Sequence, residues 1–326
     1  MKEKKLKVGK KGYVIGIDGG GTKTEAALAN LTGKFLNLMK TGSSSSTNIG
    51  IKKTAENLAE VINKIKQNKK VDLIFLGLPG VEKIYKNKKE EIKREILKRL
   101  KDFDGKIIID SDQIVAFRSG TDEKDGVVFI SGTGCVCHGW RGNKEVKASG
   151  WGWLADEGSG FWVGQKGLQT VFKELDGRKP KTLITKLLFD EWGLKNQDDL
   201  LNKIYLNYSV RQISLISKIV DKAADKGDKI AKSIMEEAVK ELVMSATTVI
   251  NKLNFQKQIF PMVLVGGMFD SKITSQVFIK EVKKIAEKAK FLKPKENPVI
   301  GAVKLAIEQL ITNKDQSIAS NEDFES

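Results

Sequence analysis

The stretch YVIGIDGGGTKTEAALAN at residues 13–30 decides the fold class of this chain. An apolar run ends in a carboxylate at Asp18, three glycines follow, and a second apolar run begins soon after them. Short apolar runs joined by glycine-rich turns are typical of β-hairpins. A further turn at Leu31–Lys34 and the run Phe35–Met39 extend the pattern, so the sequence predicts a β-meander.

Two common phosphate-binding loops do not fit the turn at Gly19–Gly21. A P-loop requires G-x-x-x-x-G-K-[ST], and counting from Gly16 places Thr22 where that motif has its lysine. A G-x-G-x-x-G dinucleotide motif counted from Gly19 requires a glycine at Thr24. Both motifs also continue into a helix, whereas here a strand follows. Three successive glycines nevertheless let backbone N–H groups approach an anion, so we expect this turn to bind phosphate.

The same pattern begins again in the middle of the chain. An expected strand at Gly126–Ile130 runs into the turn Ser131–Gly134, and a second strand follows at Cys135–Trp140. Helical segments come next, and a later strand at Phe260–Val265 meets the pair Gly266–Gly267. This repetition predicts a duplicated α/β protein in which each half directs a glycine turn at a common cleft.

The segments between the two turns alternate between helical and strand patterns. Apolar spacing predicts helices at Thr54–Lys66 and Ile84–Leu100 and a buried strand at Val71–Leu78. The serine-rich segment Thr41–Thr47 is expected to be a loop, and Pro298–Leu310 a closing helix.

Domain boundaries follow from these elements. The N-terminal half is predicted at residues 12–116 and the C-terminal half at residues 117–297. The helix at residues 298–311 is expected to pack back on the first half. Residues 1–11 and 312–326 are polar and are predicted to be flexible tails.

Composition argues against several classes of protein. The chain has 57 Lys+Arg and 41 Asp+Glu, a formal charge of +16, yet few of the basic residues are Arg, the residue that contacts phosphate and guanine in bidentate fashion. The lysines are dispersed or interleaved with glutamates, so we expect no nucleic acid partner. No apolar run approaches the roughly 20 residues that span a bilayer. With two cysteines and no apolar segment behind the basic N-terminus, we expect a cytoplasmic protein without a membrane partner.

The glycine motifs resemble those of a known superfamily. Residues 15–24 are similar to the first phosphate motif of the actin-like, sugar kinase and heat-shock-70 ATPases, residues 131–134 to the second, and residues 263–267 to the adenosine motif. Residues 107–117 and 297–306 resemble the two connecting segments. The resemblance implies duplicated ribonuclease H-like (actin-like ATPase) domains flanking an interdomain cleft.

Two further segments narrow the resemblance. SGWGW at residues 149–153 and DEGSG at residues 156–160 are similar to the BadF/BadG/BcrA/BcrD group, which includes N-acetylglucosamine kinases and a broad-specificity hexokinase. The resemblance thus implies an ATP-dependent kinase that phosphorylates a hydroxyl of a hexose or N-acetylhexosamine. It assigns ATP to Gly19, Gly20, Gly21, Thr22, Lys23, Gly132, Thr133, Gly134, Gly266 and Gly267. Asp18, at a strand end beside the first turn, is expected to hold Mg²⁺ through water. We also expect a homodimer.

Asp112 is the candidate general base. An aspartate within reach of a sugar hydroxyl can accept its proton, which contributes about 10²–10⁴-fold to the rate. The same residue can instead be the N-cap of a helix that begins at Gln113, and Asp110 is a rival carboxylate. The resemblance favours Asp112, because the sugar kinases carry their base at the matching position.

The resemblance says less about the identity of the acceptor than about the use of ATP. The resemblance assigns sugar binding to Asn48, Gly80, Asp112, Gly150, Trp151 and Asp156, although the segment before Asp156 is one residue shorter than usual in the group. One alternative is a kinase for a sugar acid such as 2-keto-3-deoxygluconate. Another is an ATPase activator with an iron–sulfur cluster held by cysteines across a dimer. The cysteines of this chain, Cys135 and Cys137, lie in the second hairpin without the further pair that a four-ligand metal site needs.

Overall fold

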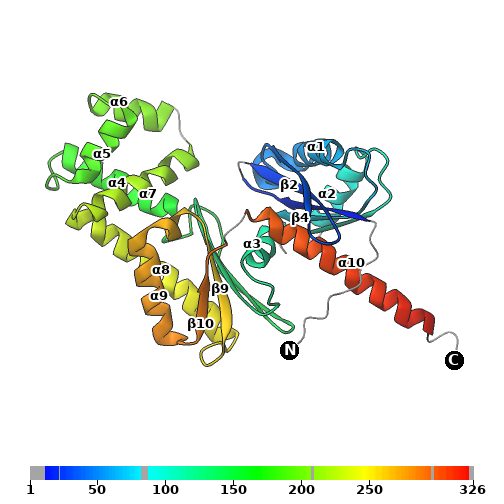
Figure 1. Cartoon of the computed structure of the whole chain (residues 1–326). Coiled ribbons are helices and arrows are strands. Elements are labelled where there is room, and N and C mark those ends of the chain that lie inside the picture. The colour runs from blue at the N-terminus through cyan, green and yellow to red at the C-terminus, as the bar shows by residue number, and fades with distance from the viewer. Residues whose placement is uncertain (1–11, 22, 82–86, 207–208, 295–296, 323–326) are drawn as a thin grey trace. The chain divides into compact units, whose positions relative to one another are not determined.

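The computed structural model describes residues 12–21, 23–81, 87–206, 209–294 and 297–322. The chain divides into two compact units (Figure 1). Unit 1 comprises the residues up to Asp122 together with those from Pro294 onward, and unit 2 comprises Glu123–Lys293. Among the described helices, none has the length and apolarity needed to cross a membrane.

Unit 1 opens with three strands and then alternates helices with strands: β1 (Tyr13–Asp18), β2 (Thr24–Asn30), β3 (Phe35–Thr41), α1 (Ser46–Lys66), β4 (Val71–Leu78), α2 (Lys88–Leu97), β5 (Lys106–Ser111), α3 (Asp112–Gly120) and, after unit 2, α10 (Val299–Glu322). Unit 2 opens in the same way and inserts more helices: β6 (Gly126–Ser131), β7 (Cys135–Arg141), β8 (Lys144–Ser149), α4 (Gly160–Leu175), α5 (Leu183–Trp192), α6 (Gln197–Leu201), the π-helix η1 (Asn202–Leu206), α7 (Val210–Asp225), α8 (Lys229–Lys252), β9 (Phe260–Val265), the 3₁₀-helix η2 (Gly267–Asp270), α9 (Lys272–Ile285) and β10 (Ala289–Leu292).

The two sheets have the same strand order and the same strand directions. In unit 1 the order is β3-β2-β1-β4-β5. Strand β2 is antiparallel to both β1 and β3, whereas β4 and β5 are parallel to β1. In unit 2 the order is β8-β7-β6-β9-β10, with an antiparallel meander on one side of β6 and parallel strands on the other. The predicted duplication is therefore confirmed.

Helices cover both faces of the sheet in unit 1, with α1 and α2 on one side and α10 on the other (Figure 1). Successive residues of a strand point to opposite faces. Ile17 accordingly packs with Leu58 of α1, whereas Val14 packs with Val303 of α10. A Cβ atom on Gly16 would lie 2.4 Å from the backbone nitrogen of Val303, so glycine lets α10 lie directly on β1.

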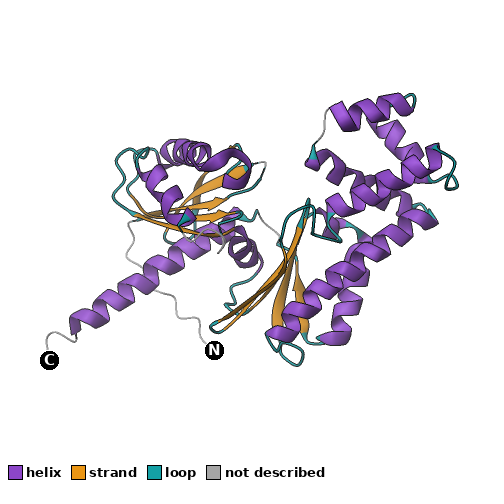
Figure 2. Cartoon of the chain, turned by 180° about the vertical axis from the view of Figure 1, so that it is seen from behind, coloured by secondary structure: helices purple, strands orange, loops and turns teal. Residues whose placement is uncertain are grey.

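Unit 2 joins a sheet to a helical bundle (Figure 2). One face of the sheet packs against α8 and α9 through a core that includes Phe129, Leu242 and Phe278. A separate core, formed by α4, α5, α7 and the first part of α8, makes up the helical end of the unit. Helix α4 begins beside the turn after β6, because the Gly160 amide donates a hydrogen bond to the Gly132 carbonyl at 2.7 Å.

Several predicted helix boundaries were wrong. Helix α1 begins at Ser46, so the end of the predicted serine loop is helical, and the backbone at Gly50 interrupts the helix with φ of 77°. Helix α2 ends at Leu97 rather than Leu100, while its predicted start at Ile84 lies outside the described residues.

The last helix also extends further than predicted. Helix α10 continues to Glu322, through most of the segment predicted to be a flexible tail. The predicted boundary between residues 116 and 117 falls inside α3, which runs to Gly120, and the units divide after Asp122. Polar residues occur in helices as well as in tails, so composition alone did not show that the helix continues past Leu310.

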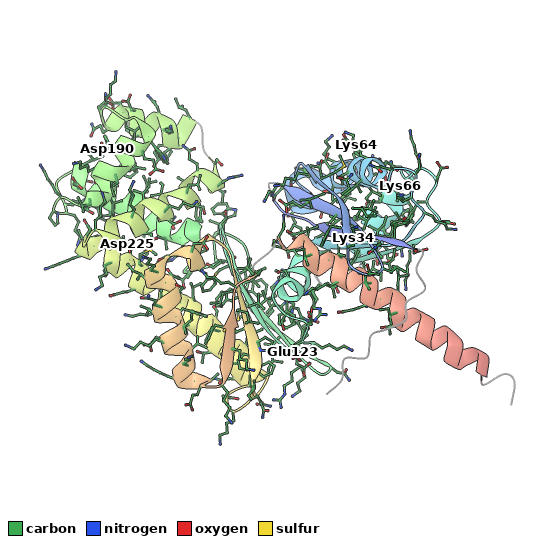
Figure 3. All side chains as sticks on the ribbon, in the orientation of Figure 1. Lys34, Lys64, Lys66, Glu123, Asp190 and Asp225 are labelled. Atoms are coloured by element: carbon green, nitrogen blue, oxygen red, sulfur yellow. The ribbon has the colours of Figure 1, made fainter. Side chains whose placement is uncertain are left out.

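The lysine-rich segments carry local ion pairs. Lys64, labelled in Figure 3, contacts Glu60 one turn earlier in α1 at 2.6 Å, whereas the buried Lys66 donates to the Asp102 carbonyl. Near the end of α2, Glu95 pairs with both Lys98 and Arg99. Glutamates interleaved with basic residues thus form local ion pairs at these positions.

Candidate active site

The candidate residues of unit 1 meet at one edge of its sheet. β1, β4 and β5 run parallel, and their register places Asp18 beside Gly77 and Gly77 beside Asp110. β3 ends at the same edge, where Thr41 pairs with Thr24, so the serine loop follows there. Ligands of open α/β sheets bind at the carboxyl ends of parallel strands. This edge is therefore the candidate site of unit 1.

The first glycine turn is packed tightly at this edge. The Gly19 amide donates to the Gly77 carbonyl at 2.7 Å, and a Cβ atom on Gly19 would lie 2.4 Å from Oγ of Ser44. The Gly20 carbonyl accepts a hydrogen bond from the Ser44 amide at 3.1 Å. The serine loop thus holds the turn, and the Gly19 N–H group is already used within the protein.

The end of the turn lies beside a predicted acceptor residue. A Cβ atom on Gly21 would lie 3.4 Å from Nδ2 of Asn48, at the start of α1. The structure therefore brings a predicted ATP-binding glycine next to a predicted sugar-binding amide. Thr22, also predicted to bind ATP, lies outside the described residues.

The pKa of Asp18 lies well above the ordinary value of an aspartate. Burial, followed by the charges of Asp112 and Glu25, raises the pKa of Asp18 to about 7, while Lys23 acts in the opposite direction. Asp18 ends β1 and Asp112 directly follows β5, so both predicted functional carboxylates lie at this edge of the sheet. A strongly perturbed acid among other acids is typical of a functional site.

Glu25 is a member of this group that sequence reasoning missed. Its side chain is 3% exposed, and Oε1 contacts Nζ of Lys23 at 3.1 Å and Nζ of Lys40 at 3.2 Å. These contacts, with the nearby Asn297 side chain, lower the pKa of Glu25 against the opposing effect of burial. The strand pattern alone offered no signal for Glu25, because every second residue of a strand is often polar.

Asp112 is not the N-cap of the helix that follows it. The N-cap of α3 is Ser111, whose hydroxyl accepts a hydrogen bond from the Ile114 amide, and Asp112 is the first helical residue. One Asp112 oxygen accepts from Nε2 of Gln113 at 3.0 Å. The capping interpretation of Asp112 was therefore wrong.

The rival carboxylate Asp110 is engaged elsewhere. Its Oδ1 contacts Nζ of Lys89 at 2.9 Å and accepts a hydrogen bond from the Ser111 amide at 2.9 Å. Asp110 is thus engaged by Lys89 and by its neighbour's amide, and the assignment of the general base to Asp112 stays a prediction.

Gly80 lies beside Thr47, at the end of the serine-rich segment. Its φ of 66° favours glycine, and a Cβ atom would lie 3.4 Å from Cγ2 of Thr47. Its carbonyl accepts a hydrogen bond from Nζ of Lys88, a buried lysine whose pKa is lowered by burial. Gly80 is thus adjacent to the residue that precedes Asn48, as expected if both contact one acceptor.

The residues around Asp18 fit Mg²⁺ bound through water. Among the described residues there is no cluster of three or more acidic, histidine or cysteine side chains that could enclose a metal ion. Mg²⁺ usually keeps several waters and takes few protein ligands when it accompanies a nucleotide. A single ligating carboxylate suits that mode of binding, and a nearby cation would favour the charged form of Asp18 against the opposing effects of burial and the acidic neighbours.

The second glycine turn, in unit 2, is held differently. The Gly132 amide donates to the Gly134 carbonyl at 2.9 Å, and the Thr133 carbonyl accepts from the Phe161 amide at 3.1 Å. The side chain of Thr133 is exposed, and nothing lies within 4 Å of a Cβ atom placed on Gly132. The outer surface of this turn is therefore open.

Asp156 fixes the inner side of this turn. It is 3% exposed, and its carboxylate accepts backbone hydrogen bonds from Cys135, Trp151 and Gly152 at 3.2, 2.9 and 3.2 Å. Burial raises its pKa, and these hydrogen bonds oppose the shift. Its role as a sugar ligand stays a prediction, and the structure gives it a clear role in holding two loops. Trp151, by contrast, is 79% exposed, and Gly150 adopts φ of 78°.

The predicted adenosine motif packs directly on the second turn. Gly266 has φ of 103°, and a Cβ atom there would lie 2.3 Å from the Ser131 carbonyl oxygen and 3.1 Å from the Gly132 nitrogen. Gly267, beside it, has open space around its Cα atom. The structure thus brings together the predicted phosphate and adenosine segments of unit 2.

The two cysteines do not form an exposed metal site. Cys135 and Cys137 are 3% and 0% exposed, and both belong to the core of unit 2. Burial raises the pKa of Cys135 to about 12, which disfavours the thiolate that binds metal. These environments give no support to an iron–sulfur cluster shared with a second copy.

Comparisons with known proteins agree over nearly the whole chain. The model of the BadF/BadG/BcrA/BcrD ATPase family matches residues 15–306. The chain is 32% identical to the N-acetylmuramic acid/N-acetylglucosamine kinase of Clostridium acetobutylicum, over 90% of this chain and 98% of that protein. It is 33% identical to the N-acetyl-D-glucosamine kinase of Dictyostelium discoideum, over 90% of this chain and 97% of that protein. A solved structure from Chromobacterium violaceum matches with a TM-score of 0.70 at 22% identity, over 91% of this chain and 99% of the other.

Proposed function

This chain belongs to the BadF/BadG/BcrA/BcrD ATPase family, and on that basis we propose that it is an ATP-dependent kinase of hexoses or N-acetylhexosamines. Its duplicated sheets and its likeness to solved relatives give it the actin-like ATPase fold. The observation that carries the proposal is the pair Asp18, at the end of β1, and Asp112, directly after β5, at the edge of the sheet beside the first glycine turn. Phosphoryl transfer needs a means of neutralising phosphate charge and a base for the acceptor hydroxyl, and this pair offers both.

Asp112 is proposed as the general base. Its carboxylate would accept the proton of the acceptor hydroxyl as that oxygen bonds to the γ-phosphorus of ATP. The bond between the γ-phosphorus and the bridging oxygen breaks, and ADP leaves. Asp112 suits this role because it begins a helix without capping it and lies near Asp18.

Asp18 is proposed to hold Mg²⁺ through water. The ion would supply positive charge beside the transferred phosphoryl group. ATP contacts are proposed for the residues of the two glycine turns and for Gly266 and Gly267. In the first turn, these contacts must come from groups other than the Gly19 N–H, which donates to Gly77.

The proposed acceptor is an N-acetylhexosamine such as N-acetylglucosamine. Two curated relatives that each match 90% of the chain are named as kinases of this class of sugar, which favours it over 2-keto-3-deoxygluconate. Sugar contacts are proposed for Asp112 and for Asn48, Gly80, Gly150, Trp151 and Asp156. A homodimer and a cytoplasmic location are proposed as well, and light scattering of the purified protein tests the former.

A coupled assay of ADP formation tests the proposal. Purified protein with ATP and Mg²⁺ would be supplied in turn with N-acetylglucosamine, glucosamine, glucose, mannose and 2-keto-3-deoxygluconate. We expect ADP formation to require a sugar and the highest kcat/KM with an N-acetylhexosamine. ADP formation that is equal with and without every sugar would contradict the proposal.

A further inference from the structure

Three charged residues stand side by side across the hairpins at the edge of unit 1. The register pairs Asp18 of β1 with Glu25 of β2, and Glu25 with Lys40 of β3. Directly opposite residues of antiparallel strands lie on the same face of the sheet. Neighbouring strands are about 4.8 Å apart, so the backbone of Lys40 lies about 10 Å from that of Asp18. Lys40 is therefore close to the first glycine turn although it is distant in sequence.

Glu25 joins Lys40 to Lys23, a residue of that turn. A single oxygen of Glu25 contacts both ammonium groups, at 3.1 Å for Lys23 and 3.2 Å for Lys40. The carboxylate is 3% exposed, whereas the lysine side chains are 69% and 62% exposed. The buried carboxylate thus fixes two exposed ammonium groups near each other, and the cluster keeps one net positive charge.

We propose that Lys40 is a further nucleotide-binding residue, which together with Lys23 binds the β- and γ-phosphates of ATP. Adjacent phosphates present several anionic oxygens within a few ångströms, which suits two ammonium groups held by one carboxylate. Glu25 is then a positioning residue for both lysines. This inference rests on the proposed use of ATP and adds a residue from a strand outside the recognised motifs.

The simpler alternative is that Lys40 only stabilises the hairpin. A cross-strand ion pair of this kind affects the stability of the hairpin, and nothing about it alone would alter nucleotide affinity. The two roles therefore differ in what Lys40→Met changes. A structural role alters only the unfolding temperature, and a binding role alters the affinity for ATP.

Calorimetric titration with ATP, AMP and the acceptor sugar separates these roles. We expect Lys40→Met to bind ATP about tenfold more weakly than wild type, with a shallower dependence of Kd on salt, because one charge-assisted contact is lost. Binding of AMP, which lacks the β- and γ-phosphates, should be unchanged. Lys40→Arg, which keeps the charge, should restore most of the affinity.

Lys34→Met is the matched control, because Lys34 is an exposed lysine just before the opposite end of β3 (Figure 3). We expect it to bind ATP like wild type. Equal ATP affinity and equal salt dependence in Lys40→Met and wild type would overturn the role of Lys40 while leaving the proposed kinase intact. No binding of ATP by the wild-type protein would overturn both. A Lys40→Met protein with reduced affinity for AMP as well would also contradict a contact confined to the outer phosphates.

Discussion

The two glycine turns occupy equivalent places in equivalent sheets, yet their surroundings differ. The turn of unit 1 follows the carboxylate Asp18 and lies near Asp112 and Glu25, and the pKa of Asp18 is raised to about 7. At the turn of unit 2, the nearby carboxylate is Asp156, and it is buried with its oxygens bonded to backbone amides. One copy of the fold therefore gathers several acids around its turn, and the other uses one acid to link two loops.

This difference indicates that the acids of the two units have different roles. Carboxylates at the carboxyl ends of parallel strands can take part in metal binding and proton transfer. A carboxylate saturated by backbone hydrogen bonds fixes loop geometry instead. Unit 1 is thus expected to contribute the chemical step and unit 2 a rigid nucleotide-binding turn. Substitutions at the acids of the two turns should separate rate effects from stability effects.

The largest effect is expected for Asp112→Asn. Loss of the general base should lower kcat by about 10²–10⁴-fold, while the Kd for ATP and the unfolding temperature change little. Steady-state kinetics combined with calorimetric ATP binding measures both. Turnover at the wild-type rate in this variant would remove Asp112 from the mechanism. It would also contradict the proposal that the acids of unit 1 act in the chemical step while the acid of unit 2 is structural.

The second-largest effect is expected for Asp156→Ala, and it concerns stability. Three backbone amides would lose their buried acceptor, so the free energy of unfolding should fall by about 3 kcal/mol. Urea unfolding measures the change, and Asp190→Ala, at an exposed position in α5 of the same unit, is the control expected to lie within about 0.5 kcal/mol of wild type. An unchanged stability with a raised KM for the sugar would show that Asp156 acts as an acceptor ligand instead.

A smaller and pH-dependent effect is expected for Asp18→Asn in the absence of Mg²⁺ and ATP. The folded protein holds the Asp18 proton up to about pH 7, whereas the unfolded chain releases it near its ordinary pKa, so stability falls as the pH rises between these values. The variant has no carboxyl group to deprotonate at this position, so its stability should not fall in this way. At pH 8 it should be more stable than wild type by about 1–2 kcal/mol, after allowance for solvent screening.

The gain of Asp18→Asn should be smaller at pH 5 and should vanish near pH 4. Thermal unfolding across this range measures it, and Asp110→Asn, which removes a carboxylate paired with Lys89, is the control expected to give no gain. A variant less stable than wild type at pH 8 would show that Asp18 stabilises the fold rather than serving a ligand.

Much of the fold could be predicted from the sequence, because apolar runs and glycine turns are local signals. Both meanders and both turns were found in this way. The role of Ser111 as N-cap was missed because Ser111 and Asp112 are both good capping residues, and only the backbone shows which one precedes the helix. The site was less predictable than the fold. Glu25 depends on strand register, and Asp156 depends on a loop that folds back to place three amides around it.

The stoichiometry of products tests the central claim most directly. Wild-type protein would be incubated with N-acetylglucosamine, ATP and Mg²⁺, and the ADP and the phosphorylated sugar would be quantified by mass spectrometry. A kinase with Asp112 as base should form one sugar phosphate for each ADP, and Asp112→Asn should lose both products together. Formation of ADP without a phosphorylated sugar would contradict the assignment and would indicate an ATPase with a different acceptor.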